Sequence, residues 1–181
     1  HNPKEYNGYK IYDERGVQLL PEASKEVAQY ISEIKNELSI DIDNFTENEN
    51  LIHFLDERYD DIFIDAALNI RINENIELRE TPIVYTPLHG TGAEIIPKAV
   101  NAAGFSPFFT VNEQMNPSPN FIHAPIPNPE DYAAFDLAVK KANELKADYL
   151  IATDPDADRV GVCVRKNYHE FKLLSGNELG A

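Results

Sequence analysis

The chain has 181 residues, which is enough for one full α/β domain and part of another. Its 16 lysines and arginines stand against 31 aspartates and glutamates, and the net charge of −15 disfavours nucleic acid and anionic membranes as partners. No apolar stretch approaches the roughly 20 residues that a membrane helix needs, and residues 1–5 show no signal-peptide pattern. We therefore expect a cytoplasmic globular protein that binds neither nucleic acid nor membrane.

The single cysteine, Cys163, excludes an intramolecular disulfide and suits a reducing compartment. Val160, Val162 and Val164 alternate around it with Gly161, a pattern typical of a buried strand. We therefore interpret Cys163 as a structural residue rather than a reactive one.

The first 70 residues predict a hairpin, two helices and a polar linker between them. Residues 9–12 and 17–20 flank an Asp-Glu-Arg-Gly turn. Pro21 opens a helix with apolar residues at helical spacing as far as Leu38. Residues 39–50 are rich in Asn, Asp and Glu, and a second helix is expected from about Asn50 to Ile70.

From residue 82 onward, the pattern alternates between strands and helices. Strands are predicted at residues 83–85, 107–111, 149–153, 160–164 and 171–174, and helices at residues 95–103 and 131–146. This alternation is typical of right-handed βαβ units. We therefore expect an α/β fold with a mixed, mainly parallel sheet and helices on both of its faces.

An acidic loop follows the strand predicted at residues 149–153. Asp154, Asp156 and Asp158 recur at every second position, and Arg159 comes directly after them. Three close carboxylates repel one another by roughly a few kcal/mol at an effective dielectric constant near 20, so a cation is expected among them. A hard divalent cation prefers such oxygen ligands, and Arg159 adds a fixed positive charge.

Such a loop has three other interpretations. It resembles many acidic loops that are simply solvated. A calcium EF-hand is excluded, because Arg159 stands where the motif needs Gly and Arg165 where it needs a bidentate Glu. A phosphatase with an aspartyl nucleophile in a D-x-D loop would need Thr or Val where Asp158 stands.

Four segments together carry a resemblance to a known family. They are His1-Asn2-Pro3-Lys4 followed by Asn7-Gly8-Tyr9-Lys10, then His89-Gly90-Thr91-Gly92, the aspartate loop, and Ser175-Gly176-Asn177-Glu178. The chain resembles the α-D-phosphohexomutase superfamily, the phosphoglucomutases and phosphomannomutases. That family carries its phosphorylated serine in the pattern T-A-S-H-N-P, so the serine would directly precede His1.

The resemblance implies roles for individual residues. Asp154, Asp156 and Asp158 would hold Mg²⁺ together with the serine phosphate, and Arg159 would orient or neutralise that phosphate. Lys10 would act as general acid/base, and His1 would lie beside the phosphoserine. The partners implied are hexose phosphates, namely glucose 1-phosphate, glucose 6-phosphate and glucose 1,6-bisphosphate.

The resemblance also implies that the chain is a piece of a larger enzyme. Residues 1–46 would be the C-terminal part of domain I, residues 47–168 domain II, and residues 169–181 the start of domain III. We expect phosphoglucomutase-type chemistry, inactive in this chain alone because the serine and domains III and IV are missing. Phosphomannomutase, phosphopentomutase, phosphoglucosamine mutase and a non-catalytic metal-binding module remain as alternatives.

The histidines outside the first motif are expected to be structural. His89 precedes a short glycine turn, which is a weak phosphate signal, so we favour a structural or interface role for it. His53, His123 and His169 have no carboxylate or cysteine partner at ligand spacing and are interpreted as ordinary surface or core residues.

Overall fold

The computed structural model describes residues 10–39, 50, 52–72, 80–168 and 170–181. The chain divides into a smaller unit within residues 7–55 and a larger unit that contains residues 56–181. The linker predicted at residues 39–50 lies almost entirely outside the described residues, as does Tyr9 of the predicted hairpin. In the part of the chain that is described, no helix is both long and apolar enough to cross a bilayer.

The smaller unit contains the first helix and, where a hairpin was predicted, a tight turn with a single antiparallel bridge between Tyr12 and Gln18. The Asp13 carboxylate accepts the backbone N–H groups of Arg15 and Val17 at 2.9 and 3.0 Å, and Gly16 takes the left-handed φ of 74° that closes the turn. Helix α1 (Pro21–Glu33) follows, with proline in its first turn. It ends before the predicted Leu38 because Ile34 is extended, and a 3₁₀ turn (Glu37–Ser39) comes after it.

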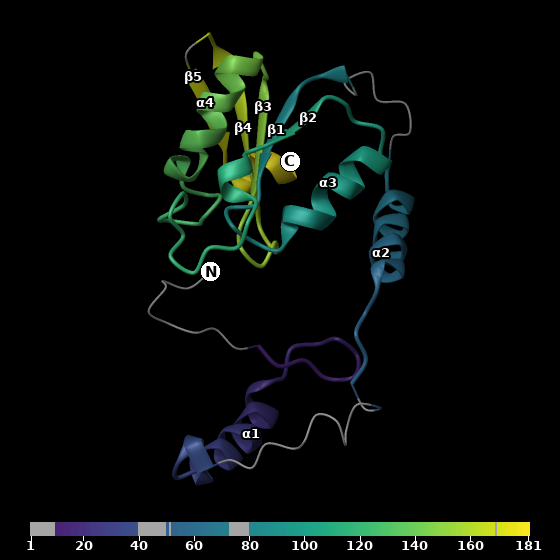
Figure 1. The fold of residues 1–181 in the computed structure, drawn as a ribbon, viewed down its shortest axis with the longest axis vertical. Coiled ribbons are helices and arrows are strands. Elements are labelled where there is room, and N and C mark those ends of the chain that lie inside the picture. The colour runs from purple at the N-terminus through teal and green to yellow at the C-terminus, as the bar shows by residue number, and fades with distance from the viewer. Residues whose placement is uncertain (1–9, 40–49, 51, 73–79, 169) are drawn as a thin grey trace. The chain divides into compact units, whose positions relative to one another are not determined.

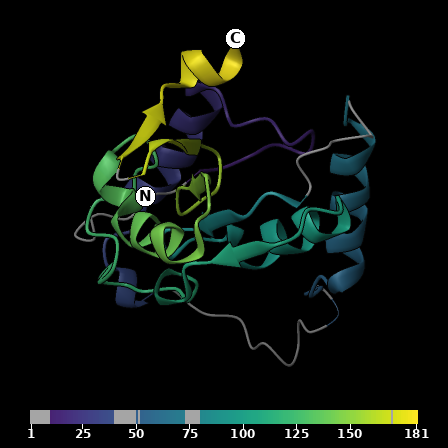
Figure 2. The same ribbon diagram turned by 90° about the horizontal axis from the view of Figure 1, so that it is seen from above.

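The larger unit opens with helix α2 (Glu57–Asn69), which lies beside α3 (Gly92–Ala102) in Figures 1 and 2. Prediction placed the start of α2 near Asn50. The helix begins later because the Asp56 side chain caps it, accepting the N–H of Arg58 at 3.1 Å. An ion pair of 2.7 Å between Lys98 Nζ and Asp60 Oδ2 joins the two helices.

Five strands form one mixed sheet in the order β2-β1-β3-β4-β5. They are β1 (Ile83–Thr86), β2 (Phe108–Thr110), β3 (Tyr149–Thr153), β4 (Val160–Asn167) and β5 (Glu170–Leu174). Strand β1 pairs in parallel with β2 and β3, whereas the β3–β4 and β4–β5 pairs are antiparallel. The predicted mixed α/β fold is confirmed, and a short helix α5 (Gly176–Gly180) follows the sheet.

Two crossover connections join the parallel strands. Helix α3 connects β1 to β2, and α4 (Asp136–Leu145) connects β2 to β3 across β1. These crossovers run in opposite directions across the sheet, so right-handed connections place α3 and α4 on opposite faces. The strand order reverses between β1 and β3, and ligands of open α/β sheets bind beyond the carboxyl ends of the strands at such a point.

The helix predicted at residues 131–146 is divided. Asp131 caps a 3₁₀ turn (Tyr132–Phe135) through the N–H of Ala133 at 2.9 Å, and the regular helix begins at Asp136. Phe135 and Leu150 are completely buried in the core of the sheet and helix α4.

Cys163 belongs to the same core and has no exposed surface. Burial raises the pKa of its thiol to about 12, because a thiolate would lose its hydration there. The prediction that Cys163 is structural is therefore confirmed.

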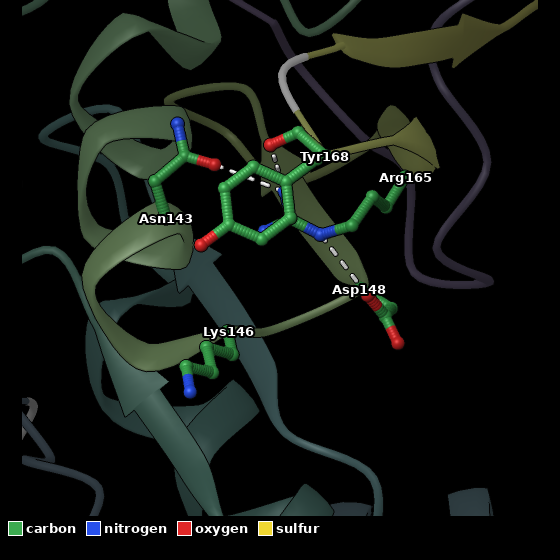
Figure 3. A pocket seen from close by; sticks show the side chains of 5 residues that line it. All are labelled: Asn143, Lys146, Asp148, Arg165 and Tyr168. Carbon is green, nitrogen blue, oxygen red and sulfur yellow. Dashed lines mark hydrogen bonds and ion pairs between the residues drawn. The ribbon is translucent and has the colours of Figure 1, made fainter.

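A cavity of about 340 Å³ lies at the end of α4, away from the aspartate loop, and Arg165 is its most constrained residue (Figure 3). The cavity is lined by Asn143, Lys146, Asp148, Arg165 and Tyr168. The guanidinium donates to the carbonyls of Ala142, Ala147 and Tyr168 and to the side chains of Asn143 and Asp148. It also lies 4.4 Å from the centre of the Phe171 ring. Arg165 therefore joins α4 to β4 and β5 rather than facing a ligand.

Candidate metal centre

The aspartate loop is the connection between β3 and β4. The last paired residues of these antiparallel strands are Thr153 and Val160, so residues 154–159 close a hairpin. The N–H of Ala157 donates to the carbonyl of Asp154 at 3.0 Å, and Ala157 adopts a left-handed φ of 57°. The loop is therefore a defined turn at the carboxyl end of a central strand.

The structure brings the three predicted carboxylates together. One oxygen from each of Asp154, Asp156 and Asp158 lies within 4.8 Å of the others. Asp154 is completely buried, whereas Asp156 and Asp158 are exposed. An all-oxygen donor set with two exposed members suits a hard divalent cation such as Mg²⁺, which retains water or phosphate oxygens in its remaining positions.

Arg159 compensates the buried charge of Asp154. Its backbone N–H donates to Asp154 Oδ1 at 3.1 Å and its Nε donates to Oδ2 at 2.9 Å. Its Nη1 reaches Asn128 Oδ1 at 3.4 Å, and its Nε lies 3.8 Å from Asp158 Oδ1. The two bonds from Arg159 therefore fix the orientation of the Asp154 carboxylate.

The pKa of Asp154 is raised, and burial is the largest cause. The hydrogen bonds from Arg159 act in the opposite direction, while the nearby Asp156 charge adds to the increase. The predicted positive charge beside the loop is thus present, and it partly offsets the cost of an ionised Asp154.

Buried polar side chains support the carboxyl ends of β1 and β3. Tyr85 Oη and Thr153 Oγ1 lie 2.8 Å apart and join the two strands. Burial raises the pKa of Tyr85 to about 12, so its hydroxyl stays protonated. Thr86 Oγ1 donates to Gln114 Oε1 at 2.6 Å and accepts the N–H of Leu88 at 3.1 Å. The Thr86 hydroxyl therefore links the turn after β1 to Gln114.

His89 holds the long loop of residues 112–130 against this turn. Its Nδ1 lies 2.7 Å from the carbonyl of Asn116, and its Nε2 accepts the N–H of His123 at 3.3 Å. A neutral imidazole with its proton on Nδ1 satisfies both contacts. The rings of His89 and His123 stack with centres 6.0 Å apart. These bonds agree with the structural role predicted for His89.

A second cavity, of about 430 Å³, begins directly after Arg159 at the same edge of the sheet. It is lined by Pro129, Glu130, Val160, Gly161, Leu173, Leu174, Ser175, Gly176 and Glu178. Ser175 and Glu178 cap each other at the start of α5, and an ion pair with Lys172 and bonds from Ser175 lower the pKa of Glu178 to about 2. Ser175 and Glu178 therefore hold the start of α5 beside this cavity.

The structure does not test the roles predicted for Lys10 and His1. Lys10 is exposed and belongs to the smaller unit, while the aspartates belong to the larger one. His1 lies outside the described residues, as does His169. The roles of Lys10 and His1 therefore stay predictions.

Sequence reasoning missed several supporting residues of the site. Asn128, Tyr85 and Gln114 reach the site through contacts between distant segments, and no local pattern marks them. The Gly90-Thr91-Gly92 turn did carry a signal, since two glycines so close together suggest a close backbone approach.

Comparison with known proteins identifies the family of the chain. The family described as "Phosphoglucomutase/phosphomannomutase, alpha/beta/alpha domain II" matches residues 61–167, and the corresponding domain I description matches residues 1–38. Proteins named phosphoglucomutase from Staphylococcus aureus strains MRSA252 and N315 are each 39% identical over the whole chain, which spans 32% of their length. A solved putative phosphomannomutase from Thermus thermophilus is 22% identical, with a TM-score of 0.46 over 61% of this chain and 24% of that one. Because the domain II match covers more than half of it, the chain belongs to the phosphoglucomutase/phosphomannomutase family.

Proposed function

We propose that this chain carries the metal-binding part of a phosphoglucomutase. The whole enzyme would interconvert hexose 1-phosphate and hexose 6-phosphate through a phosphoserine and a bisphosphorylated sugar. The observation that carries the proposal is the set of three carboxylates whose oxygens lie within 4.8 Å, next to an arginine. The names of the 39% identical relatives support the choice of phosphoglucomutase.

The chemistry assigns a task to each residue of the site. Asp154, Asp156 and Asp158 would hold Mg²⁺, which supplies positive charge to the oxygens of a transferring phosphoryl group. The bond from Arg159 Nε to Asp154 orients the guanidinium group. Its Nη atoms would donate charge-assisted hydrogen bonds to the transferring phosphoryl group. Lys10 is proposed to move a proton to or from a sugar hydroxyl.

The domain limits, the location and the sugar are also proposed. The boundaries at residues 46 and 168 are proposed domain limits, and the location is proposed to be cytoplasmic. The sugar is proposed to be glucose, with the phosphates of mannose, glucosamine and pentose as alternatives. Because the chain spans about a third of its relatives' length, we propose that it has no mutase activity by itself.

Calorimetric titration of the 181-residue chain with MgCl₂ tests the metal site. We expect weak, saturable binding, because three carboxylates are present and a phosphate ligand is not. The Asp156→Ala variant should bind far less, and Asp61→Asn, which changes an exposed carboxylate on α2, is the matched control. Equal binding by the unaltered chain and Asp156→Ala would contradict the assignment.

A coupled assay for glucose 6-phosphate tests whether the chain lacks mutase activity by itself. The chain, supplied with glucose 1-phosphate, glucose 1,6-bisphosphate and Mg²⁺, should show no turnover above background. Measurable turnover that Lys10→Ala abolishes would overturn the proposed inactivity while supporting the role of Lys10.

A further inference from the structure

The turn after β1 and the aspartate loop after β3 touch through their backbones. A Cβ atom on Gly90 would lie 2.4 Å from Pro155 Cα and 2.6 Å from the Pro155 carbonyl oxygen. Gly90 does not adopt a left-handed φ, so this contact alone requires glycine there. Any side chain at residue 90 must displace the loop or the turn.

A hydrogen bond fixes the same point of the aspartate loop. The backbone N–H of Thr91 donates to the carbonyl of Pro155 at 2.9 Å, and the Thr91 hydroxyl lies 3.3 Å from that oxygen. Pro155 lies between Asp154 and Asp156 in the chain. Holding its carbonyl therefore restricts the peptide plane that leads into Asp156. The close approach of Gly90 to Pro155 Cα restricts the end of the preceding plane, which leads from Asp154.

Gly92 extends the contact to the strand below. A Cβ atom there would lie 2.4 Å from Tyr85 Oη and 2.9 Å from Thr153 Oγ1. These two hydroxyls form the bond that joins β1 to β3, and Thr153 directly precedes Asp154. The first residue of α3 thus packs on the point where β3 passes into the aspartate loop.

The turn that makes these contacts is itself held in place. Leu88 is completely buried and His89 is 7% exposed, both with left-handed φ angles of 49° and 67°. The bonds of His89 to Asn116 and His123 keep this conformation. The turn is therefore held in one conformation, and its contacts with Pro155 restrict the conformation of the aspartate loop.

We propose that the Gly90-Thr91-Gly92 turn is a positioning element of the metal site, which keeps the carboxylates of Asp154 and Asp156 in one binding geometry. This inference rests on the proposed function, in which the loop holds a divalent cation. The turn would act through the backbone of Pro155, to which Thr91 donates, rather than as a metal ligand.

Titration of the 181-residue chain with MnCl₂, followed by electron paramagnetic resonance of free Mn²⁺, tests the inference. Loss of a residue that orients metal ligands commonly weakens affinity by about 10–100-fold, and Gly90→Ala should fall in that range. Gly176→Ala is the matched control, because its Cβ would meet nothing within 4 Å. Circular dichroism and thermal unfolding in EDTA report separately on folding.

Two variants of Thr91 test the same inference if Gly90→Ala does not fold. Thr91→Val removes the hydroxyl but keeps the backbone donor and should weaken Mn²⁺ binding measurably, while Thr91→Ser should restore it. Unchanged affinity in Gly90→Ala, or equal affinity in the two Thr91 variants if Gly90→Ala does not fold, overturns the positioning role. Absence of Mn²⁺ binding by the unaltered chain refutes the proposed function and, with it, this inference.

Discussion

Replacing Asp156 by asparagine should stabilise the chain without metal and destabilise it, relative to the unaltered chain, when metal is present. The Asp156 carboxylate repels Asp154, whose pKa it helps to raise, and a ligand oxygen of Asp158 lies within 4.8 Å. At 4.8 Å each pair costs about 3.5 kcal/mol at a dielectric constant of 20 and about 0.9 kcal/mol in water.

The water value is the better guide, because Asp156 and Asp158 are exposed. Two such pairs, screened at physiological ionic strength, leave a net repulsion of about 1 kcal/mol in the free energy of unfolding. For a chain of this size, that corresponds to an increase of about 2–4 °C in Tm for Asp156→Asn in EDTA.

Thermal unfolding by circular dichroism, in EDTA and in 10 mM MgCl₂, measures both effects. Metal that binds the folded state at about ten times its Kd adds about 1.4 kcal/mol to the unaltered chain, so the order of the two Tm values should reverse. The control Asp61→Asn should stay within about 0.5 kcal/mol in both buffers. A lower Tm for Asp156→Asn in EDTA, or a difference that 1 M NaCl does not reduce, would refute the electrostatic reasoning.

Three further predictions concern the scaffold. Gly161→Ala should destabilise the chain by about 3 kcal/mol or more in urea unfolding, because its Cβ would lie 2.1 Å from a backbone oxygen, whereas Gly180→Ala, with open space, should not. Arg165→Met should cost about 2–4 kcal/mol in the same assay, since it removes the guanidinium bonds to the partly buried carbonyls of Ala142 and Ala147, and a cost under 0.5 kcal/mol would contradict this. Glu178 has a lowered pKa, so its contribution to stability is complete above its ordinary value of 4.5 and is lost as pH falls toward about 2. A carboxyl titration by NMR with an ordinary midpoint for Glu178 would show that its capping and ion pair are absent in solution.

The sequence predicted the strands and the acidic loop well because both are local patterns. The alternation around Cys163 and the apolar run before Asp154 each lie within a few residues, and hydrophobic periodicity reports such segments directly. The helix ends were less accurate. Asp56 begins α2 through a side-chain cap, and this cap outweighed the apolar periodicity that extended the prediction back to Asn50. The segment after Asp131 forms a 3₁₀ turn before the regular helix begins at Asp136.

The supporting contacts of the site were not predictable because they join segments far apart in the chain. Arg159 was expected beside the metal loop, but its bond to Asn128 depends on how the 112–130 loop folds back. Arg165 entered the sequence argument only as a mismatch to an EF-hand, yet its donors hold the end of α4. Tertiary packing, rather than local propensity, decides such partners.

The change of strand direction at β3 has a consequence for how the molecule folds. Strands β3, β4 and β5 follow one another as hairpins within residues 149–174, so their pairing closes only short loops. Strands β1 and β2 join through crossovers that contain whole helices, and such long loop closures are slower. The aspartate loop therefore belongs to the most sequence-local part of the sheet. Its approximate shape can form early in folding, and docking of the Gly90 turn then completes it.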